Sequence, residues 1–412
     1  MPLPSKSRKV WCSMLADLIS RNPDLQRLMD DGYSVEIRRQ TGLHLLVHDV
    51  PYRNAPGDLK RGTLVCPIHL REDNLTNAAA NHQAWFIGEH PCSIEGTPIA
   101  GIVHSSGRSD FGDGIVVDHG FSTKPRTGFY NDYYDKMTHY INVISAPAQH
   151  LDPTLTARLY KPAQTTDNSV FYYADTASTR SGIGSIAGKV AALRIAIVGL
   201  GGTGSHILDL VAKTHVNEIH LFDGDAFYSH NAFRAPSATA ISDLQTPELK
   251  AKRYARIYSV MRRGVEAHPE YVTDQNVGLL QHFDFVFICI DKGAARELIA
   301  KYLLQAGIPF IDVGMHVQMT KDAQKLVGQV RTTFFSPKKN DHFDRRVPVD
   351  SGNMRNDYGL NIQVNELNAL NAVHAVIRWK KYYGIYDDQI GEHESVYAIN
   401  AHMLTKDERV EG

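Results

Sequence analysis

The chain contains 412 residues, a length that favours two domains over one. Its 43% hydrophobic and 22% charged residues are typical of a globular protein, and the net charge of −1 gives no reason to expect nucleic acid or an anionic membrane as partner. No apolar run approaches the roughly 20 residues of a membrane span and no signal-peptide core follows the N-terminus, so we expect a cytoplasmic protein.

Cysteine and histidine usage argues against disulfide frameworks and metal sites. The cysteines are too few and too scattered for a disulfide framework: Cys12, Cys66, Cys92 and Cys289. No C-x-x-C pair occurs, which excludes a tetracysteine zinc site. The 20 histidines include no H-E-x-x-H or similar ligand spacing, so we interpret them as solvated or hydrogen-bonded side chains.

Residues 1–160 are expected to form a smaller mixed α/β domain. "YSVEIRRQTGLHLLVHDVPY" predicts a hairpin around Thr41-Gly42, and "GIVVDHG" predicts a further strand. A helix is predicted near 129–145, where aromatic and apolar side chains share one face that packs onto a small sheet. A polar segment with a proline follows it, and we place the linker at 161–175.

Strands and helices alternate in the second predicted domain, 176–412. The strand-like runs "LRIAIVG", "EIHLFD", "FDFVFICI" and "IPFIDVG" are separated by predicted helices at 203–214, 247–263 and 292–306. This alternation predicts a Rossmann-like α/β domain with a mostly parallel sheet covered on both faces. An antiparallel hairpin is predicted at 316–335, an irregular crossover segment at 336–357 and a long helix at 359–383.

A glycine-rich turn, "IVGLGGTGS" at 197–205, follows the first of these strands. Gly199, Gly201 and Gly204 fit the spacing G-x-G-x-x-G, which allows a tight turn, a close approach of backbone to phosphate and close helix–strand packing. The helix that follows directs free N–H groups and its positive end toward an anion. Asp223, at the end of the next strand, can bond ribose hydroxyls. NAD and ATP suit these features equally.

The residues after Asp223 favour ATP. A polar set follows this strand within a short distance: Asp225, Asn231, Arg234, and Lys250 or Lys252. An ATP site requires an arginine and a lysine against the triphosphate and an acid for Mg²⁺, and a dehydrogenase has no such requirement here. Asp291 ends a later buried strand, at the carboxyl edge where doubly wound sheets bind ligands.

This constellation resembles the ThiF/MoeB/HesA superfamily, which includes the ubiquitin-activating enzymes. The family pattern is G-x-G-G-x-G, then D-x-D, an asparagine, an arginine, a downstream lysine and an acid that closes a later strand. This chain matches it at Gly199, Gly201, Gly202, Gly204, Asp223, Asp225, Asn231, Arg234, Lys250 and Asp291. The resemblance covers about 176–335 and extends to the long helix.

The resemblance implies a role for these residues in one ATP site. Asp223 would bind the ribose, and Asn231, Arg234 and Lys250 would bind the phosphates. Asp291 would place Mg²⁺ and the attacking carboxylate. Family members also use an arginine from just before the glycine strand, usually donated by a partner subunit, and Arg180 lies in that neighbourhood. The resemblance thus implies ATP and Mg²⁺ as cofactors and a homodimer as the assembly.

The same resemblance implies the reaction. The C-terminal carboxylate of a ubiquitin-like protein would attack the α-phosphate of ATP, giving an acyl-adenylate and pyrophosphate. The N-terminal region resembles an uncharacterised domain that precedes a ThiF-type domain in a bacterial subgroup. In that subgroup the neighbouring genes encode a ubiquitin-like protein, a conjugating-enzyme-like protein and a protease. A bacterial conjugation pathway with a role in antiviral defence is the expected setting, and the N-terminal domain is expected to recruit a partner.

The fate of the acyl group stays open at this stage. No cysteine follows Cys289, which lies in a buried apolar run, so the usual thioester cannot form on the C-terminal domain. The adenylate could pass directly to a partner, or Cys92 in the polar stretch "GEHPCSIEGTP" could accept the acyl group. An oxyester on Ser336 or Ser351, both expected to be exposed, is the third alternative.

Three other functions are alternatives to this one. Within the family, a sulfur-carrier or small-carboxylate adenylyltransferase is the alternative, although the zinc cysteines common in sulfur-carrier activators are missing. An NAD(P)-dependent oxidoreductase is the alternative from another class, and Arg234, Lys250 and Asp291 count against it. A scaffold without activity would be expected to have lost some of the ATP-site residues.

Overall fold

The computed structural model of the chain describes residues 18–19, 21–39, 42–73, 75–77, 81–112, 114–160, 169–173, 175, 177–178, 181, 183–322, 324–348 and 362–409. They form two compact units. The first contains Met1–Ser169 and Tyr173–Gly184, and the second contains Val170–Tyr172 and Ser185–Gly412. The predicted linker at 161–175 lies partly outside the described residues.

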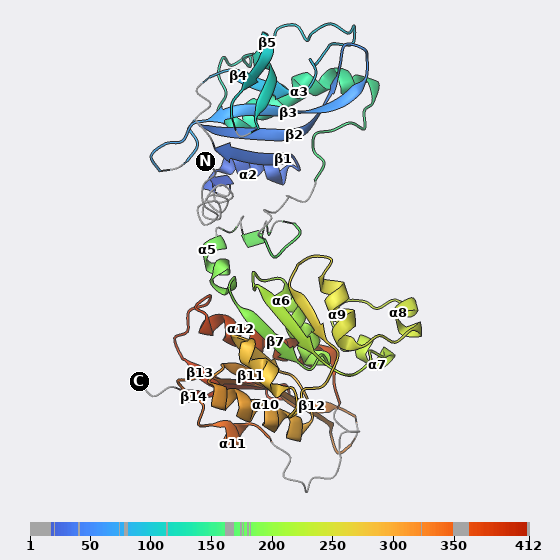
Figure 1. Cartoon of the computed structure of the whole chain (residues 1–412), viewed down its shortest axis with the longest axis vertical. Helices are drawn as coiled ribbons and strands as arrows, with labels where there is room; N and C mark the ends of the chain where they lie inside the picture. The colour runs from blue at the N-terminus through green and yellow to red at the C-terminus, as the bar shows by residue number, and fades with distance from the viewer. Residues whose placement is uncertain are drawn as a thin grey trace. The chain divides into compact units, whose positions relative to one another are not determined.

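The first unit is a six-stranded antiparallel sheet with two described helices (Figure 1). In chain order its elements are α2 (Pro23–Asp30), β1 (Ser34–Arg39), β2 (Leu43–Arg53), β3 (Leu59–Ile68), β4 (Gln83–Ile87), β5 (Val103–Asp110), β6 (Val116–Ser122) and α3 (Tyr133–Leu151). The strand order is β1-β2-β3-β4-β6-β5. The predicted hairpin is confirmed, because Ser34 in β1 lies opposite His48 in β2.

Helix α3 packs against β2 and β3 and supplies much of the core of this unit. The predicted apolar face is confirmed, since its members Tyr133, Met137 and Ile144 are all buried. The helix begins later than predicted because Asp132 caps it, accepting a hydrogen bond from the backbone N–H of Asp135 at 2.7 Å. It also continues beyond 145, as far as Leu151.

The second unit is built on an eight-stranded sheet with the order β14-β13-β12-β11-β10-β7-β8-β9. Its strands are β7 (Arg194–Val198), β8 (Glu218–Phe222), β9 (Val265–His268), β10 (Phe285–Ile288), β11 (Phe310–Met319), β12 (Leu326–Phe335), β13 (Glu392–Ala398) and β14 (Met403–Arg409). The run from β9 to β11 is parallel, and β12 to β14 extend it in antiparallel fashion. The predicted Rossmann-like sheet is thereby confirmed.

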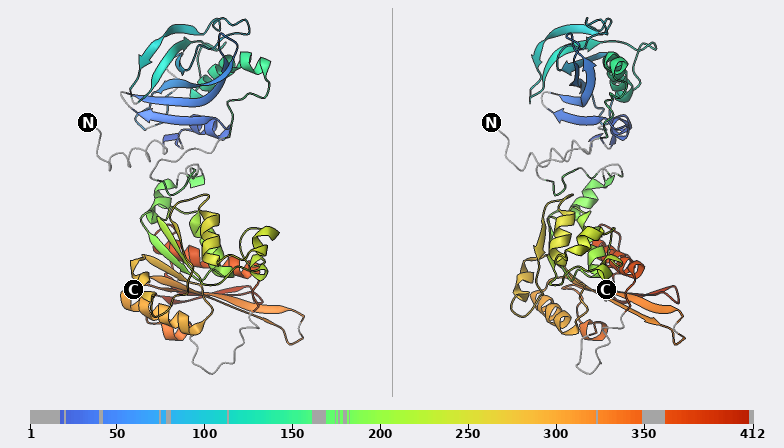
Figure 2. Two further views of the ribbon diagram at one scale, coloured as in Figure 1. Left: turned by 45° about the vertical axis from the view of Figure 1, so that its right-hand side comes forward. Right: turned by 90° about the vertical axis from the view of Figure 1, so that its right-hand side faces the viewer.

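Helices cover both faces of this sheet (Figure 2). The longer ones are α6 (Gly202–Ala212), α9 (Lys250–Tyr258), α10 (Gly293–Ala306) and α12 (Asn365–Tyr382). The shorter ones are α5 (Gly184–Ala187), η1 (Gly188–Val190), α7 (Ser229–Ala232), α8 (Ile241–Gln245), η2 (Val277–His282) and α11 (Phe343–Arg346). Two buried clusters lie on the two faces, one containing Phe287 and Trp379 and the other Ile288 and Leu303. Successive side chains of β10 thus point to opposite faces, as expected for a strand buried on both sides.

The structure also differs from the predictions at several elements. The helix predicted at 247–263 is shorter in the structure. Helix α9 begins at Lys250 and ends at Tyr258, and the chain turns at Ser259. The predicted hairpin at 316–335 is confirmed by the pairing of β11 with β12. Strands β13 and β14 were not predicted. Within the described residues, no helix is both long enough and apolar enough to span a membrane.

Candidate ATP site

The glycine turn after β7 is held by two close contacts that exclude any side chain. Gly199 has a φ of +92°, and a Cβ added there would lie 2.6 Å from the carbonyl oxygen of Cys289. A Cβ on Gly204 would lie 1.9 Å from the carbonyl oxygen of Gly199. These two glycines are therefore required to close the turn and to bring α6 against the strands.

The other two glycines of the turn differ from each other. A Cβ on Gly202 would lie 2.3 Å from the side chain of Asn368 in α12, whereas nothing in the protein lies within 4 Å of a Cβ on Gly201. Gly201 is the N-cap residue of α6, so its open side faces the region where an anion meets the helix N–H groups. Only a ligand would require glycine at this position.

Asp223, which follows β8, is buried and binds the glycine turn. Its Oδ2 accepts a hydrogen bond from the N–H of Leu200 at 2.6 Å, and its Oδ1 accepts one from the N–H of Asp225 at 2.8 Å. Burial raises the pKa of its carboxyl group, and the nearby Lys250 and the two N–H donors oppose that shift. The residue predicted to bind ribose therefore also shapes the turn that would cradle the phosphates.

Lys250 begins α9 and lies between the two carboxylates of the D-x-D pair. Its Nζ is 2.8 Å from Oδ2 of Asp225 and 3.7 Å from Oδ1 of Asp223, and its side chain is 8% exposed. Its backbone N–H also donates to the carbonyl of Asp225 at 2.8 Å. Lys252 is exposed on the same helix. This geometry favours Lys250 over Lys252 as the lysine of the site.

Asn231 and Arg234 lie on and just after the short helix α7. The side chain of Asn231 is buried, and its Oδ1 accepts a hydrogen bond from the backbone N–H of Tyr228 at 2.9 Å. Nε of Arg234 is buried and has no hydrogen-bond partner within the described part of the chain. Burial and the positive charges of Arg234 and Lys250 lower the pKa of His230, so the two cations lie close to one side chain. An anion bound here would supply the partner that Nε of Arg234 lacks.

Asp291 is exposed in the turn between β10 and α10. Its charge is among those that raise the pKa of Tyr271 to about 12, after the larger effects of a hydrogen bond to Asp225 and of burial. Nζ of Lys292 lies 4.7 Å from the centre of the Tyr271 ring. Asp291 therefore belongs to the same cluster as the D-x-D pair. Sequence reasoning missed Tyr271, Lys292 and Asn368, which no short motif connects with the glycine turn.

The chemistry of the donor set fits ATP with Mg²⁺ better than a metal held by protein alone. No group of three or more histidine, cysteine, aspartate or glutamate side chains among the described residues could hold a metal ion. Mg²⁺ is commonly bound by one or two carboxylates together with substrate phosphates. Asp291 at the open edge would supply such a carboxylate, and Arg234 and Lys250 the positive charge for the phosphates.

The candidate acyl acceptors are less well placed than expected. Of these acceptors, Ser351 lies outside the described residues. Arg180, which was expected to reach the ATP site of a partner subunit, also lies outside them. Ser336 was expected to be exposed, but this was wrong, because it is 6% exposed. It follows Phe335, which pairs with Phe310 at the start of β11, so it lies at the amino ends of the parallel strands. The glycine turn lies at their carboxyl ends. His393 Nε2 is 3.3 Å from the Ser336 hydroxyl, a base that the sequence did not reveal.

Cys92 lies in the first unit and is 1% exposed. Burial raises the pKa of its thiol, and the sulfur donates to the carbonyl of His90 at 3.3 Å. This setting disfavours a thiolate nucleophile. Burial also raises the pKa of the Cys289 thiol, in keeping with the inert role expected of it.

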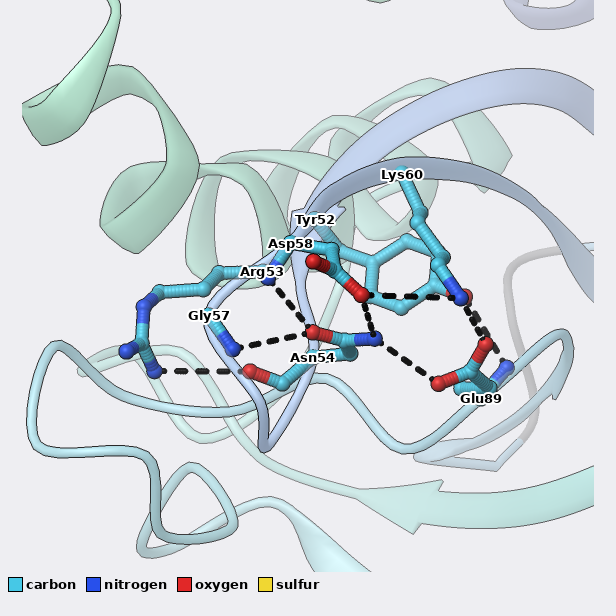
Figure 3. Close-up of polar contacts among 7 residues, drawn as sticks. All are labelled: Tyr52, Arg53, Asn54, Gly57, Asp58, Lys60 and Glu89. Carbon is cyan, nitrogen blue, oxygen red and sulfur yellow. Dashed lines mark hydrogen bonds and ion pairs between the residues drawn. The ribbon is translucent and has the colours of Figure 1, made fainter.

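A hydrogen-bond network fixes the segment around Cys92 to the β2–β3 hairpin (Figure 3). At its centre is Asn54, whose Nδ2 donates to Oε2 of Glu89 at 2.9 Å and to Oδ2 of Asp58 at 3.1 Å. Glu89 also pairs with Lys60, and its backbone N–H donates to the hydroxyl of Tyr52 at 2.9 Å. The segment is thus anchored at Glu89, the second residue of the polar stretch that contains Cys92.

Each of the two units contains a region that matches a known family model. Residues 183–377 match the ThiF family, and residues 23–176 match a domain of unknown function, DUF6791. No curated protein sequence matches the chain.

Several solved structures are similar in fold. The crystal structure of Escherichia coli MccB with MccA-N7isoASN has 16% identity and a TM-score of 0.46, covering 56% of this chain and 68% of that one. The structure of PaaA has 15% identity and a TM-score of 0.44, covering 64% and 82%. Escherichia coli MccB with ATP has 14% identity and a TM-score of 0.45, covering 66% and 79%. Likenesses of this degree carry no conclusion about activity.

The family match agrees with the site built from the residues, which has a glycine turn at a helix N-terminus, a D-x-D pair whose first carboxylate is buried, and the cations Lys250 and Arg234. It supports ATP-dependent adenylation of a carboxylate. Residues 183–377 of this chain are a ThiF family domain, preceded by a separate domain of the DUF6791 type.

Proposed function

We propose that the chain adenylates the C-terminal carboxylate of a ubiquitin-like protein as the activating enzyme of a bacterial conjugation pathway. The observation that carries this proposal is the buried Nε of Arg234, which has no hydrogen-bond partner in the described part of the chain and which, like Lys250, lies close to His230. A buried guanidinium N–H without a partner is costly, and a triphosphate would satisfy it.

The proposed reaction joins two negatively charged groups, the carboxylate of the substrate and the α-phosphate of ATP. A carboxylate oxygen attacks the α-phosphorus, an O–P bond forms, the bond to the bridging oxygen of the β-phosphate breaks, and pyrophosphate leaves. Because an anion attacks a polyanion, the main contribution of the protein is positive charge placed at the phosphates before the reaction. Arg234, Lys250 and the first turn of α6 supply it, and Mg²⁺ at Asp291 would add to it when bound. The remaining contribution is alignment of the two reactants.

The remaining parts of the proposal concern partners. The first unit would recruit the ubiquitin-like protein or a conjugating-enzyme-like protein, in a pathway of antiviral defence. A homodimer would allow Arg180 of one subunit to complete the site of the other. Because Cys92 is buried and Ser336 lies at the far edge of the sheet, we favour direct transfer from the adenylate to the conjugating partner.

The test is adenylation of a candidate ubiquitin-like protein, followed with ATP labelled in the α-phosphate. We expect labelled AMP on the intact protein and none on a version that lacks its last two residues, because the shortened tail would not bring its terminal carboxylate to the α-phosphate. Equal labelling of both versions, or labelling of small carboxylic acids alone, would contradict the ubiquitin-like substrate.

A further inference from the structure

Three charged side chains form a buried network behind the turn that carries Asp291. Asp312 in β11 is 0% exposed, and its two oxygens meet two arginines. Nε of Arg296 in α10 is 3.1 Å from Oδ1, and an Nη of Arg331 in β12 is 2.5 Å from Oδ2. The side chains of Arg296 and Arg331 are 11% and 13% exposed. The network therefore joins two strands and a helix near the carboxyl edge of the sheet.

Arg296 reaches further than this ion pair. One Nη donates to the carbonyl of Ile290 at 2.5 Å, and the other donates to the carbonyl of Pro348 at 3.4 Å. Ile290 immediately precedes Asp291, so Arg296 holds the peptide group from which Asp291 projects. Arg331 already neutralises Asp312, so charge balance alone does not require a second arginine at this position. Arg296 adds the hydrogen bonds to the carbonyls of Ile290 and Pro348.

The segment 289–291, which carries Asp291, also contacts the glycine turn at 199–204 on its other side. A Cβ on Gly199 would lie 2.6 Å from the carbonyl oxygen of Cys289 and 2.8 Å from a methyl carbon of Ile290. The N–H of Cys289 donates to the carbonyl of Val198 at 2.7 Å. The segment 289–291 therefore lies between the backbone of the glycine turn and the guanidinium of Arg296. If the Arg296 guanidinium moved, the segment 289–291 would lose its hydrogen bond on that side and keep the contact with the glycine turn.

We infer that Arg296, held by Asp312, is a positioning residue that fixes Asp291 at the ATP site. This inference rests on the proposed adenylation, in which Asp291 places Mg²⁺ and the carboxylate. Arg296 itself would touch neither nucleotide nor substrate. Lysine at position 296 keeps the charge beside Asp312 but lacks the planar fork that contacts Ile290 and Asp312 together.

The experiment compares Arg296→Lys, Asp291→Ala and the double variant in the full chain. The measurement is the Mg²⁺ concentration that gives half-maximal ATP–pyrophosphate exchange in the presence of the ubiquitin-like protein. We expect Arg296→Lys to raise this concentration roughly tenfold, since a small misplacement of a catalytic group is costly. In the Asp291→Ala background we expect Arg296→Lys to add no further loss, because the two residues act through one contact. Additive losses, or an unchanged Mg²⁺ requirement, would overturn the inference.

The control is Arg194→Lys, which changes an arginine at the start of β7 whose Nε is 2.6 Å from Glu218. This edge of the sheet lies away from Asp291, so we expect an unchanged Mg²⁺ requirement. A Mg²⁺ requirement that rises equally in Arg194→Lys would reveal a general loss of stability and would also overturn the inference.

Hydrogen exchange of the peptide covering 289–293 gives a readout that does not depend on activity. Arg296→Lys should speed exchange in this peptide, and Arg194→Lys should not. If the unaltered protein showed no pyrophosphate exchange, the proposed function would fail, and hydrogen exchange would still decide the role of Arg296. Unchanged protection of the peptide would contradict that role.

Discussion

Lys250 shows how single side chains define the candidate site. It is buried and lies within reach of two carboxylates, whereas Lys252 on the same helix is exposed. We expect Lys250→Gln to lower the rate of ATP–pyrophosphate exchange about 100-fold, the order of loss seen when one preorganised charge at a transition state is removed. Lys252→Gln is the matched control and should stay within about twofold of the unaltered enzyme. A larger loss in Lys252→Gln would assign the phosphate contact to that residue.

Adding one methyl group is expected to have different effects at two glycines of the turn, Gly204 and Gly201. Gly204→Ala would place a Cβ 1.9 Å from the carbonyl oxygen of Gly199, so the folded state should be strongly destabilised. A Cβ on Gly201 meets nothing within 4 Å, so Gly201→Ala should keep the thermal midpoint and weaken ATP binding by contact with the phosphates. Thermal unfolding and calorimetric ATP titration distinguish the two effects. Unchanged ATP affinity in Gly201→Ala would place the nucleotide elsewhere.

Cys92 is not expected to accept the acyl group. Because its thiol is buried and its pKa is raised by burial, Cys92→Ala should leave the rate of transfer of the ubiquitin-like protein unchanged. The rate is measured with a labelled ubiquitin-like protein and the conjugating partner. Loss of transfer with adenylation intact would restore Cys92 as acyl acceptor.

The site residues differ in how far the sequence predicts them. The glycines, the D-x-D pair and Arg234 lie within one continuous stretch that runs from β7 through α6 and β8 to just after α7, where spacing along the chain indicates position at the edge of the sheet. Asn368 and Arg296 approach the glycine turn and Asp291 from other helices, and only tertiary packing brings them there. The spacing of residues along the chain also does not predict the solvent exposure of a side chain. For this reason Ser336 was expected at the surface, although it is buried.

At the scale of elements, Arg262 ties the end of α6 to the start of β8. It is 0% exposed, and its guanidinium donates to the carbonyls of Ala212 at 3.3 Å, Thr214 at 3.1 Å and Val216. Burial lowers its pKa to about 10. Removing the donors would leave buried carbonyls without partners, at a cost of about 1 kcal/mol or more each.

We therefore expect Arg262→Met to lower the free energy of unfolding by about 3 kcal/mol. Arg256→Met is the control, because Arg256 is 56% exposed and its pair with Glu248 is of the surface kind, typically about 0–1 kcal/mol. Urea unfolding of both variants checks this. A loss in Arg262→Met no larger than in Arg256→Met would show that water replaces the guanidinium.

Sequence periodicity predicted the central strands and helices because strands buried on both faces are continuous apolar runs. It failed at the edge of the second sheet. Strand β13 contains "EHESVYA" and β14 contains "MLTKDER". These polar runs are ordered by pairing that their composition does not indicate, because β13 pairs with β12 and β14 pairs with β13. Helix α9 is shorter than predicted because the polar–apolar pattern continues into the turn at Ser259.

At the scale of the whole molecule, the first unit is expected to lose stability in acid through Glu36. In the first unit Glu36 accepts hydrogen bonds from His48 at 2.9 Å and Arg38 at 2.6 Å. The hydrogen bond from His48, with the smaller effect of Arg38, lowers the pKa of Glu36 from 4.5 to about 2 against the opposing effect of burial. A lowered carboxyl pKa stabilises the folded state above pH 4.5, and this contribution is lost as the pH falls toward 2.

Glu36→Gln should therefore be less stable than the unaltered chain at neutral pH and should lose less stability on acidification through this window. The measurement is urea unfolding of the full chain at neutral pH and at about pH 3, where the Glu36 contribution is partly lost. Glu72→Gln, at an exposed position of the same unit, is the control. An unaltered pH dependence in Glu36→Gln would show that other carboxyl groups determine the acid response.

ATP–pyrophosphate exchange by the full chain with its ubiquitin-like protein tests the central claim most directly. The account predicts exchange that requires ATP, the ubiquitin-like protein and Mg²⁺, and that falls about 100-fold in Arg234→Ala because a preorganised cation at the phosphates is lost. Absence of both exchange and ATP binding in the unaltered protein would contradict the adenylation account. Exchange that survives in Arg234→Ala would leave adenylation standing and contradict the site.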